Sequence, residues 1–343
     1  MKQTELPITM KAVLLPAYNQ NVIRAMVGLK VNDIAIPAIQ RKQVLVKMEA
    51  ATCNPSDVAF IRGVYGIKKN LPAIPGFEGC GIVVAADNHP AAEMLIGKRV
   101  SCLATSDGYG TWAEYLVTDY SNCIEINKNI PTNQAACMFV NPLTSLALMD
   151  IVKKSGRKSL IINAAASQVG QMIRSLAKKE DITIINIVRR EEQAEKLMNE
   201  HEKYVIISTD EDFDNKLKSM AAETNALMAF DAVGGEMTGK ILNAMPESGK
   251  IVVYGGLSGE PIGGISTLEI IYKKKIVYGF NLMDWLKTTE TSAFKHITDD
   301  LQTLMESGEI KTEVQGQFNF TDVIAGMKQY LGNMSAGKII FCP

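Results

Sequence analysis

The chain of 343 residues has few of the residues from which metal sites and disulfide frameworks are built. It holds three histidines and six cysteines, and no two cysteines form a CxxC pair. A disulfide framework is not expected, because a chain of this length can bury an adequate core without one. Neither charge is in excess, with 36 basic and 37 acidic residues. This balance argues against a nucleic-acid-binding arm or a polybasic membrane anchor.

Long apolar runs are also missing, since none reaches the roughly 18 residues that a membrane span needs. The N-terminus has neither a signal-peptide core nor an Arg-rich transit segment, so we expect a cytoplasmic location. What is present is the composition of a globular protein, 47% hydrophobic and 21% charged. The length predicts about two domains.

The first part of the chain, to about Asn127, is rich in short strands separated by turn residues. In Val44–Ala51, apolar and polar positions alternate in the manner of a half-buried strand. Irregular strands with few helices predict a small barrel or rolled sheet. The expected strands are Lys11–Leu15, Val44–Ala51, Cys80–Ala86, Arg99–Ala104 and Trp112–Val117.

From about Pro142 the pattern changes to strands that alternate with helices. The expected strands are Ser159–Asn163, Thr183–Val188, Tyr204–Ser208, Leu227–Val233, Lys250–Gly255 and Lys275–Gly279. Helical spacing lies between them, for example in Val169–Lys179. This alternation predicts an α/β fold with a doubly wound parallel sheet. After Ser292 the chain turns helical and ends in another apparent strand, GKIIFCP. We therefore predict a catalytic domain of residues 1–135, completed by 285–343, with a cofactor domain of residues 136–284 inserted.

A candidate dinucleotide site follows the first strand of this sheet, in NAAASQVGQ. Such a site needs small residues, so that backbone N–H groups and a helix N-terminus can reach a pyrophosphate. The run from Ala164 to Gly170 has the spacing AxxGxxG, with Ser167 in place of the middle glycine. An ordinary strand-to-helix turn is the alternative interpretation.

The end of the second strand indicates which cofactor is bound. NAD enzymes usually place Asp or Glu there to bind the ribose hydroxyls. This chain has Arg189 and Arg190 instead. Guanidinium groups suit a 2′-phosphate, so we predict NADPH over NADH. The alternative is that both arginines pair with the glutamates that follow them.

Paired glycines at two further strand ends, in Phe230–Gly235 and Tyr254–Leu257, would let the backbone approach the cofactor closely or would serve only as turns.

Taken together, the motifs are similar to those of a known family. From Met10 to Phe341 the chain resembles the medium-chain dehydrogenase/reductase superfamily, in its zinc-free quinone reductase and enoyl-thioester reductase branch. The segments that carry the resemblance are CNPSDVAFIRGVYG, LPAIPGFEGCGIVV, YGTWAEYLV, FVNPLTS, NAAASQVGQ, NIVRR, DAVGG, VYGGLSG and GFNLMDW. It implies a GroES-like β-barrel catalytic domain, interrupted by a Rossmann domain that binds NADPH.

The resemblance also bears on metal binding. Zinc members of the superfamily carry a Cys where this chain has Asn54, and a His where it has Phe77. Asn is a poor zinc ligand and Phe is none, so we expect no metal. Without a metal ion, the expected chemistry is hydride addition to the β carbon of a conjugated C=C bond.

In the matching enoyl reductases a tyrosine at the position of Tyr65 supplies the proton, and a phenol is protonated at neutral pH. The alternative is a tyrosine that only lines the pocket. Asn54 is expected to orient the nicotinamide ribose or the substrate carbonyl, and it also suits an Asn-Pro turn. Lys68 and Lys69 are candidates for contacts with thioester phosphates, or are plain loop charges.

The resemblance further implies a set of cofactor contacts. Asn141 and Thr144 reach the nicotinamide half, and Lys338 contacts a cofactor phosphate or is solvated. Gln168 replaces a usual glycine and would be strained if φ were positive there. Asn281 replaces a usual tryptophan of the pocket, which leaves the substrate open. The remaining cofactor contacts are Ala166, Ser167, Val169 and Gly170 at the pyrophosphate, and Tyr254, Gly255, Gly256, Leu257, Phe280, Leu282 and Met283 at the nicotinamide.

Three functions remain open at this stage. The first is an NADPH-dependent reductase of a 2-enoyl thioester or enone. The second is an NADPH:quinone oxidoreductase on the same scaffold, and the third is a non-catalytic NADPH-binding protein. A homodimer is expected from the family, joined through the edge strand Lys275–Gly279.

Overall fold

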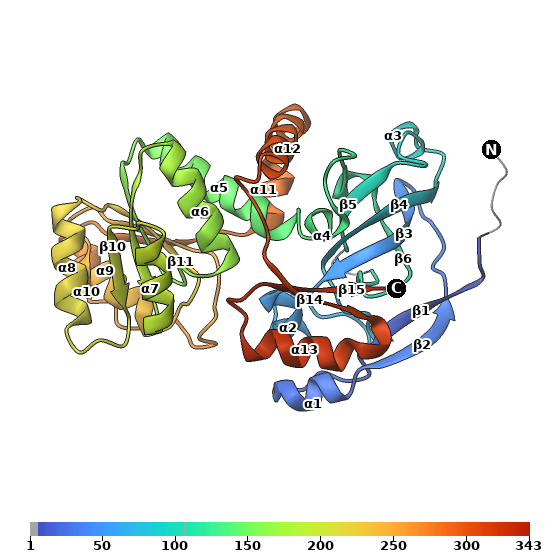
Figure 1. Cartoon of the computed structure of the whole chain (residues 1–343), viewed down its shortest axis with the longest axis horizontal. Coiled ribbons are helices and arrows are strands. Elements are labelled where there is room, and N and C mark those ends of the chain that lie inside the picture. The colour runs from blue at the N-terminus through green and yellow to red at the C-terminus, as the bar shows by residue number, and fades with distance from the viewer. Residues whose placement is uncertain (1–5, 106–107) are drawn as a thin grey trace. The chain divides into compact units, whose positions relative to one another are not determined.

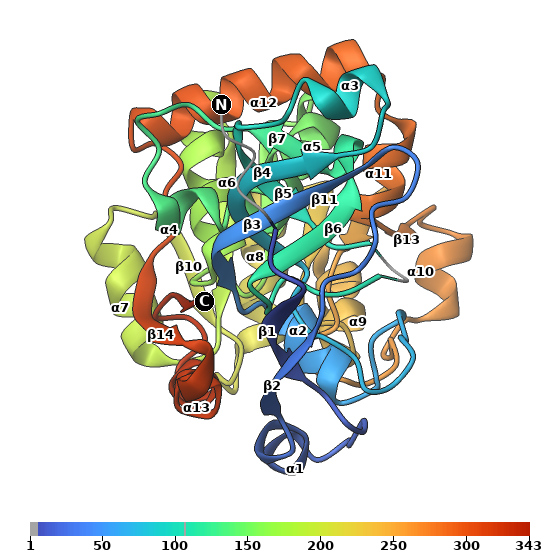
Figure 2. The same cartoon turned by 90° about the vertical axis from the view of Figure 1, so that its right-hand side faces the viewer.

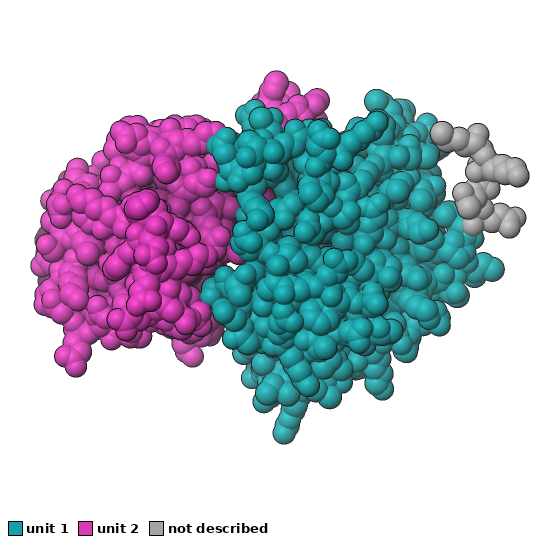
Figure 3. All heavy atoms as spheres, viewed as in Figure 1, with its two compact units in different colours: residues 1–141, 300–343 teal, residues 142–299 magenta. Residues whose placement is uncertain are grey.

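The computed structural model describes residues 6–105 and 108–343 and divides into two compact units. Unit 1 comprises residues 1–141 and 300–343, and unit 2 comprises residues 142–299 (Figure 3). The second junction lies later than the predicted 284/285. The reason is that α11 (Leu282–Thr288) and the first half of α12 (Thr291–Glu306) belong to unit 2.

Unit 1 is built on a mostly antiparallel sheet. Within the described residues the sheet has seven strands in the order β14-β15-β3-β4-β5-β7, and β6 also pairs with β3 (Figure 2). The strands are β3 (Gln43–Thr52), β4 (Glu78–Ala86), β5 (Arg99–Leu103), β6 (Tyr115–Asp119), β7 (Cys123–Glu125), β14 (Val314–Asn319) and β15 (Lys338–Cys342). Because β15 pairs with β3, the end of the chain completes the sheet that the first part begins.

The remaining elements of unit 1 surround this sheet (Figure 1). They are the antiparallel pair β1 (Thr9–Leu14) and β2 (Lys30–Ala35), and the helices α1 (Val22–Val27), α2 (Pro55–Ile61), α3 (Pro90–Glu93), α4 (Thr132–Ala135) and α13 (Val323–Gly332). Strand β3 has apolar cores on both sides. Val44 and Val46 belong to one hydrophobic cluster, and Leu45 belongs to the other.

Unit 2 contains the predicted doubly wound sheet, which the structure confirms. Its six strands are parallel and lie in the order β10-β9-β8-β11-β12-β13. The strands are β8 (Ser159–Ile162), β9 (Thr183–Val188), β10 (Tyr204–Ile207), β11 (Met228–Asp231), β12 (Lys250–Val253) and β13 (Ile276–Gly279). The order reverses between β8 and β11, and ligands of such sheets bind at the carboxyl ends of the strands at that reversal.

The helices of unit 2 alternate with its strands. They are α6 (Gln168–Lys179), α7 (Glu191–Asn199), α8 (Phe213–Glu223), α9 (Glu236–Ala244), α10 (Thr267–Ile271) and α11, while α5 (Val140–Ser155) precedes the sheet. Helices α8 and α9 bury Phe213, Leu217 and Leu242 against Ile161 and Ile185 of the strands. This packing fixes the sheet whose strand ends carry the predicted cofactor loops.

Candidate active site and cofactor loops

The segment Asn54–Asp57 begins helix α2, and its residue types explain why. Asn54 is the N-cap with extended backbone angles, and Pro55 occupies the first turn, where its missing N–H costs nothing. Asp57 Oδ2 accepts a hydrogen bond of 2.6 Å from the backbone N–H of Asn54. The backbone of Asn54 is thereby fixed by its own sequence neighbours.

The side chain of Asn54 is bound by two residues that are distant in sequence. Its Nδ2 donates to Glu78 Oε1 over 2.8 Å, and its Oδ1 accepts from Lys338 Nζ. Glu78 begins β4 and Lys338 begins β15, and both strands pair with β3. Glu78 Oε2 accepts two further hydrogen bonds, from the backbone N–H groups of Phe139 (3.1 Å) and Val140 (2.8 Å).

The groups in this cluster are almost completely buried, which alters their acidity. Burial raises the pKa of Asp57 to about 7, although backbone hydrogen bonds and the charge of Lys338 act to lower it. Burial also raises the pKa of Glu78, against the lowering effect of Lys338 and of its three hydrogen bonds. Each carboxylate is therefore easier to protonate than in water.

Tyr65 lies in the loop that follows α2. Gly63 has a φ of +71°, and a Cβ there would lie 2.9 Å from the Cβ of Tyr18, so the turn favours glycine. The Tyr65 ring is 5.1 Å from the ring of Phe77, the neighbour of Glu78 in sequence. Tyr65 is 36% exposed. Burial, followed by the charge of Asp57, raises the pKa of its phenol, so the group stays protonated at neutral pH.

The two lysines of this loop differ from each other. Lys68 is exposed, whereas Lys69 is buried with its Nζ 5.9 Å from the ring centroids of both Phe60 and Phe77. Tyr18 holds the backbone of Lys69 through two hydrogen bonds, of 2.8 and 2.9 Å. Lys69 is thus part of the aromatic packing below Tyr65 and is not a surface charge.

The residues around Asn54 do not fit a metal ion. The Oδ1 of Asn54 already faces the ammonium of Lys338, which would repel a second cation. Phe77, at the place where zinc members carry a histidine, offers no ligand atom. Across residues 6–105 and 108–343, no group of three His, Cys, Asp or Glu side chains is suited to hold a metal ion.

In unit 2, the loop between β8 and α6 is a tight turn that leads into the N-terminus of α6. Ala164 takes a positive φ of 47°, and Ser167 caps α6 by accepting a 3.2 Å hydrogen bond from Gly170 N. A Cβ at Gly170 would lie 2.4 Å from the oxygen of Ala165, so the helix approaches the loop closely. Gln168 is the first residue of α6 and is not among the positive-φ residues, so the strain considered for it does not arise.

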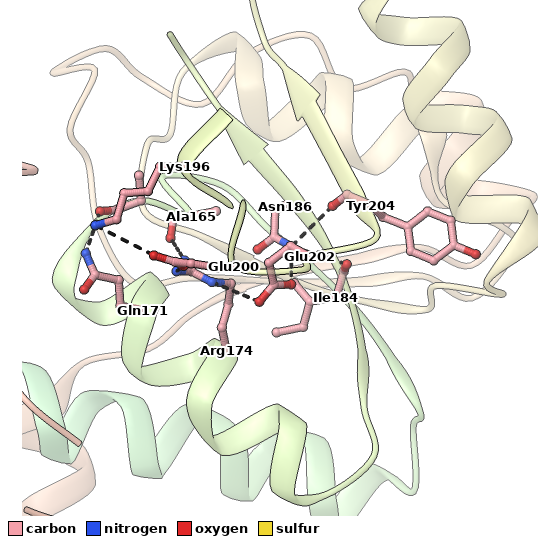
Figure 4. Close-up of polar contacts among 10 residues, drawn as sticks. Ala165, Gln171, Arg174, Ile184, Asn186, Lys196, Glu200, Glu202 and Tyr204 are labelled. Carbon is pink, nitrogen blue, oxygen red and sulfur yellow. Dashed lines mark hydrogen bonds and ion pairs between the residues drawn. The ribbon is translucent and has the colours of Figure 1, made fainter. Parts of the chain in front are cut away.

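A buried arginine supports this loop from below (Figure 4). Arg174 of α6 donates to the backbone oxygen of Ala165 through Nη1. Its other nitrogens pair with Glu200 (2.8 Å) and Glu202 (3.2 Å), and Glu202 also accepts from Asn186 of β9. Arg174 was not predicted as a site residue, because an arginine at a helical position has no local signal for burial.

Arg189 and Arg190 follow the end of β9, as predicted. Arg189 is exposed. Arg190 is partly buried and its Nε lies 2.7 Å from Glu192 Oε1, with side chains 36% and 68% exposed. The alternative of pairing with a following glutamate is therefore realised for Arg190. Both backbone N–H groups donate to Gln193 Oε1, over 3.3 and 3.2 Å, which fixes the turn into α7.

The strand ends at the sheet reversal are joined by Asn163 and Asp231. Asn163 Nδ2 donates to Asp231 Oδ1 over 2.5 Å. Asp231 also accepts from the backbone of Val233 (2.8 Å) and Gly234 (2.9 Å) and from the hydroxyl of Thr238. This network shapes the DAVGG loop. The positions of Asn163 and Asp231 at the ends of β8 and β11 were the signal from which it could have been predicted.

The remaining predicted cofactor residues lie at the expected strand and helix ends. Asn141 and Thr144 are in the first turns of α5, and both are buried. Tyr254, Gly255, Gly256 and Leu257 follow β12, while Phe280, Asn281, Leu282 and Met283 follow β13. Asn281 is exposed and caps α11, since its Oδ1 accepts from the backbone of Met283 (2.8 Å) and Asp284 (3.2 Å). Capping thus explains an asparagine at this position.

Lys338 has a different partner from the one that the resemblance implied. Its side chain is buried inside unit 1 and its Nζ contacts Asn54. A buried ammonium bound to an amide oxygen is not a solvated lysine. Because the ammonium is bound to Asn54 inside unit 1, we do not assign it to a cofactor phosphate.

Comparison with known proteins gives consistent matches. A family model described as the alcohol dehydrogenase GroES-like domain matches residues 40–128, and one described as zinc-binding dehydrogenase matches residues 169–299. The mitochondrial enoyl-[acyl-carrier-protein] reductase of Arabidopsis thaliana is 31% identical, covering 82% of this chain and 76% of the relative. The Homo sapiens protein of the same name is 29% identical, covering 89% and 83%.

Solved structures are also similar to this chain over nearly its whole length. A Mesorhizobium loti protein assigned as an NADPH:quinone reductase has a TM-score of 0.91 and 33% identity, covering 99% of this chain and 100% of that one. A mycobacterial protein complexed with NADPH has a TM-score of 0.81 at 21% identity, covering 97% and 100%. This second likeness concerns the fold alone.

Proposed function

The chain belongs to the medium-chain dehydrogenase/reductase superfamily, in its zinc-free enoyl and quinone reductase branch, and from this we propose that it reduces a conjugated C=C bond with NADPH. The substrate class is a 2-enoyl thioester or an enone. The observation that carries the proposal is Tyr65, a protonated phenol whose ring packs beside Phe77. The curated relatives named as enoyl reductases support the same chemistry.

The reaction adds one hydride and one proton to the double bond. A bound nicotinamide cofactor supplies the hydride, which adds to the β carbon. We assign to Tyr65 the donation of the proton that completes the reduction at the α carbon, because its raised pKa keeps the proton available. Asn54 orients the substrate carbonyl or the nicotinamide ribose, and Phe77 packs against the Tyr65 ring.

The residues of unit 2 fit a dinucleotide. Ser167 and Gly170 form a helix N-terminus that a pyrophosphate can approach, since only a glycine allows this contact with Ala165. Arg189, exposed after β9, is suited to bind a 2′-phosphate. We therefore assign NADPH as the cofactor, and the remaining predicted cofactor residues keep their proposed contacts, except Lys338, whose ammonium is bound to Asn54. The NADPH complex of the mycobacterial protein is consistent with what this fold can hold.

A comparison of substrates tests the proposal. Purified protein is assayed with NADPH and either crotonyl-CoA or a benzoquinone, as the wild type and as Tyr65→Phe. We expect Tyr65→Phe to lower turnover of crotonyl-CoA by about 10²- to 10⁴-fold, the range of a general-acid contribution. Tyr120→Phe is the control, because Tyr120 is a half-buried tyrosine of unit 1 that stacks on His89. Undiminished enoyl turnover in Tyr65→Phe would remove Tyr65 from the mechanism.

Quinone reduction is the second candidate, favoured by the Mesorhizobium loti structure. It predicts quinone turnover that survives Tyr65→Phe, because the quinone oxygens can be protonated from solvent. Tight NADPH binding without turnover of any enal, enone or quinone would instead indicate a non-catalytic binding protein.

A homodimer is also proposed, through pairing of β13 with its copy. Strand β13 is an edge strand, and its neighbourhood exposes apolar side chains. Ile276 is 45% exposed, and Ile271 and Tyr272 next to it are 60% and 72% exposed. Exposed apolar residues beside an unpaired strand edge are typical of a protein interface.

Cytoplasmic location remains a proposal. In the part of the chain that the structure describes, no helix has the length and apolar character to cross a bilayer. The curated relatives above are named as mitochondrial proteins. Fractionation of cells that express the tagged full chain distinguishes the two compartments.

A further inference from the structure

The amide of Asn54 is held between a buried cation and a buried anion. Lys338 Nζ donates to its oxygen, and its nitrogen donates to Glu78 Oε1 over 2.8 Å. The relative exposures are 1% for Asn54, 0% for Glu78 and 2% for Lys338. Solvent therefore has almost no access to these contacts, and their hydrogen bonds cannot be replaced by water without moving the chain.

These two neighbours leave the amide one acceptable orientation. An ammonium can only donate hydrogen bonds, and the Glu78 carboxylate acts as an acceptor toward three N–H groups, as its ionised form does. If the amide turned over, its NH₂ group would face Lys338 and its oxygen would face Glu78, so that both contacts would be repulsive. The cost of such a mismatch is large in a buried site, because each group loses its partner and has no water to replace it.

The orientation that results leaves one amide hydrogen uncommitted to Glu78. An asparagine amide has two N–H donors, and the bond to Glu78 Oε1 uses one. The oxygen side of the amide is bound to Lys338. A polar group that reaches the buried Asn54 when the surrounding chain moves therefore meets only a donor. A carbonyl oxygen or a ribose hydroxyl is the kind of group that accepts from such a donor.

We propose that Lys338 is a positioning residue, which fixes the amide of Asn54 so that it presents a hydrogen-bond donor to the reaction. This inference rests on the proposed function, in which Asn54 orients the substrate carbonyl or the nicotinamide ribose. Glu78 takes part in the same task from the other side of the amide. Its remaining oxygen is bound to the backbone at Phe139 and Val140, which prevents the carboxylate from turning away.

A double-mutant cycle tests whether Lys338 acts through Asn54. The variants are Lys338→Met, Asn54→Ala and the pair, assayed for kcat and KM with NADPH and crotonyl-CoA. We expect Lys338→Met to lower kcat by about 10- to 100-fold, the range for loss of a hydrogen bond to a charged group. The pair should be within about twofold of Asn54→Ala alone, because Lys338 has no effect once the amide is gone. Effects that multiply would overturn the proposal.

A second arm allows for the case in which Lys338→Met does not fold, because it leaves Glu78 buried without its cation. Lys338→Met combined with Glu78→Gln removes both charges and is compared with Glu78→Gln alone. We expect the combined variant to remain slower than Glu78→Gln, since the amide oxygen has lost its donor. Equal kcat values in the two folded proteins would contradict the assignment.

A readout without turnover separates this inference from the proposed function. In protein labelled with ¹⁵N-asparagine, the wild type should give one slowly exchanging Nδ2 signal pair for Asn54. Lys338→Met, or the charge-matched pair, should give two sets or broadened signals. Lys275→Met is the control, because Lys275 is a buried lysine of unit 2 bonded to the oxygen of Leu242. Unchanged Asn54 signals would refute the inference, whereas absent turnover in the wild type would refute only the proposed function.

Discussion

Selectivity for NADPH should depend unequally on the two arginines after β9. Arg189 is exposed, so a charge-assisted bond to a 2′-phosphate is at the low end of its range, about 1.5 kcal/mol or roughly tenfold in Kd. Arg190 must first give up its ion pair of 2.7 Å with Glu192, which is worth up to about 1 kcal/mol at this exposure. We expect Arg189→Ala to weaken NADPH binding about tenfold and Arg190→Ala by only about two- to fivefold.

The ion pair makes a further prediction of opposite sign. Glu192→Gln removes the carboxylate that competes for Arg190, so it should tighten NADPH binding by about two- to fivefold at low salt. None of these variants should change NADH binding by more than about twofold, because NADH has no 2′-phosphate.

Titration by fluorescence or calorimetry measures the Kd of each variant for NADPH and for NADH. Arg157→Ala is a matched control, since Arg157 precedes β8 and lies at the opposite end of a sheet strand from the cofactor loops. Arg189 would have no specific role at a 2′-phosphate if Arg189→Ala weakened the binding of NADH as much as that of NADPH, or if the wild type preferred NADH. Weaker binding of NADPH by Glu192→Gln would show that Arg190 does not contact the 2′-phosphate.

Three other predictions follow from particular contacts. Gly170→Ala places a Cβ 2.4 Å from Ala165 O, so thermal unfolding should show a loss of about 1–3 kcal/mol, and a wild-type Tm would contradict the close contact. The pKa of Asp57, about 7 when folded against roughly 3.9 unfolded, means that its contribution to stability is full below about pH 4 and is lost as the pH rises through 7. Asp57→Asn keeps an acceptor for the backbone N–H of Asn54. It should reduce the change in the free energy of unfolding with pH by up to about 1.4 kcal/mol per pH unit, as measured by denaturant titrations at pH 5 and pH 8. Ile276→Lys should give monomers in light scattering if β13 forms the dimer interface, and an unchanged mass would place the interface elsewhere.

The architecture of unit 2 and the places of its loops could be predicted from the order of residues alone. The spacing of apolar residues and the length of each apolar run identified its strands, because buried parallel strands are continuously apolar and their connecting helices are amphipathic. The positions of Ser167 and Arg189 could be predicted from the ends of the strands. The residue that caps a helix and the residue expected at the cofactor ribose both lie shortly after a strand in the sequence. In unit 1 the strand β2, which pairs with β1, was missed because its polar sequence KVNDIA shows no clear alternation.

The side chains that share the site of Asn54 could not be predicted in this way, because they come from distant parts of the chain. Glu78 and Lys338 are 24 and 284 positions away from it, and they meet because β4 and β15 both pair with β3. A lysine near the end of the chain has the same local pattern whether it is solvated, bound to a phosphate or buried against an amide. Its role is fixed by long-range strand pairing and by the charges around it, which no pattern of neighbouring residues contains.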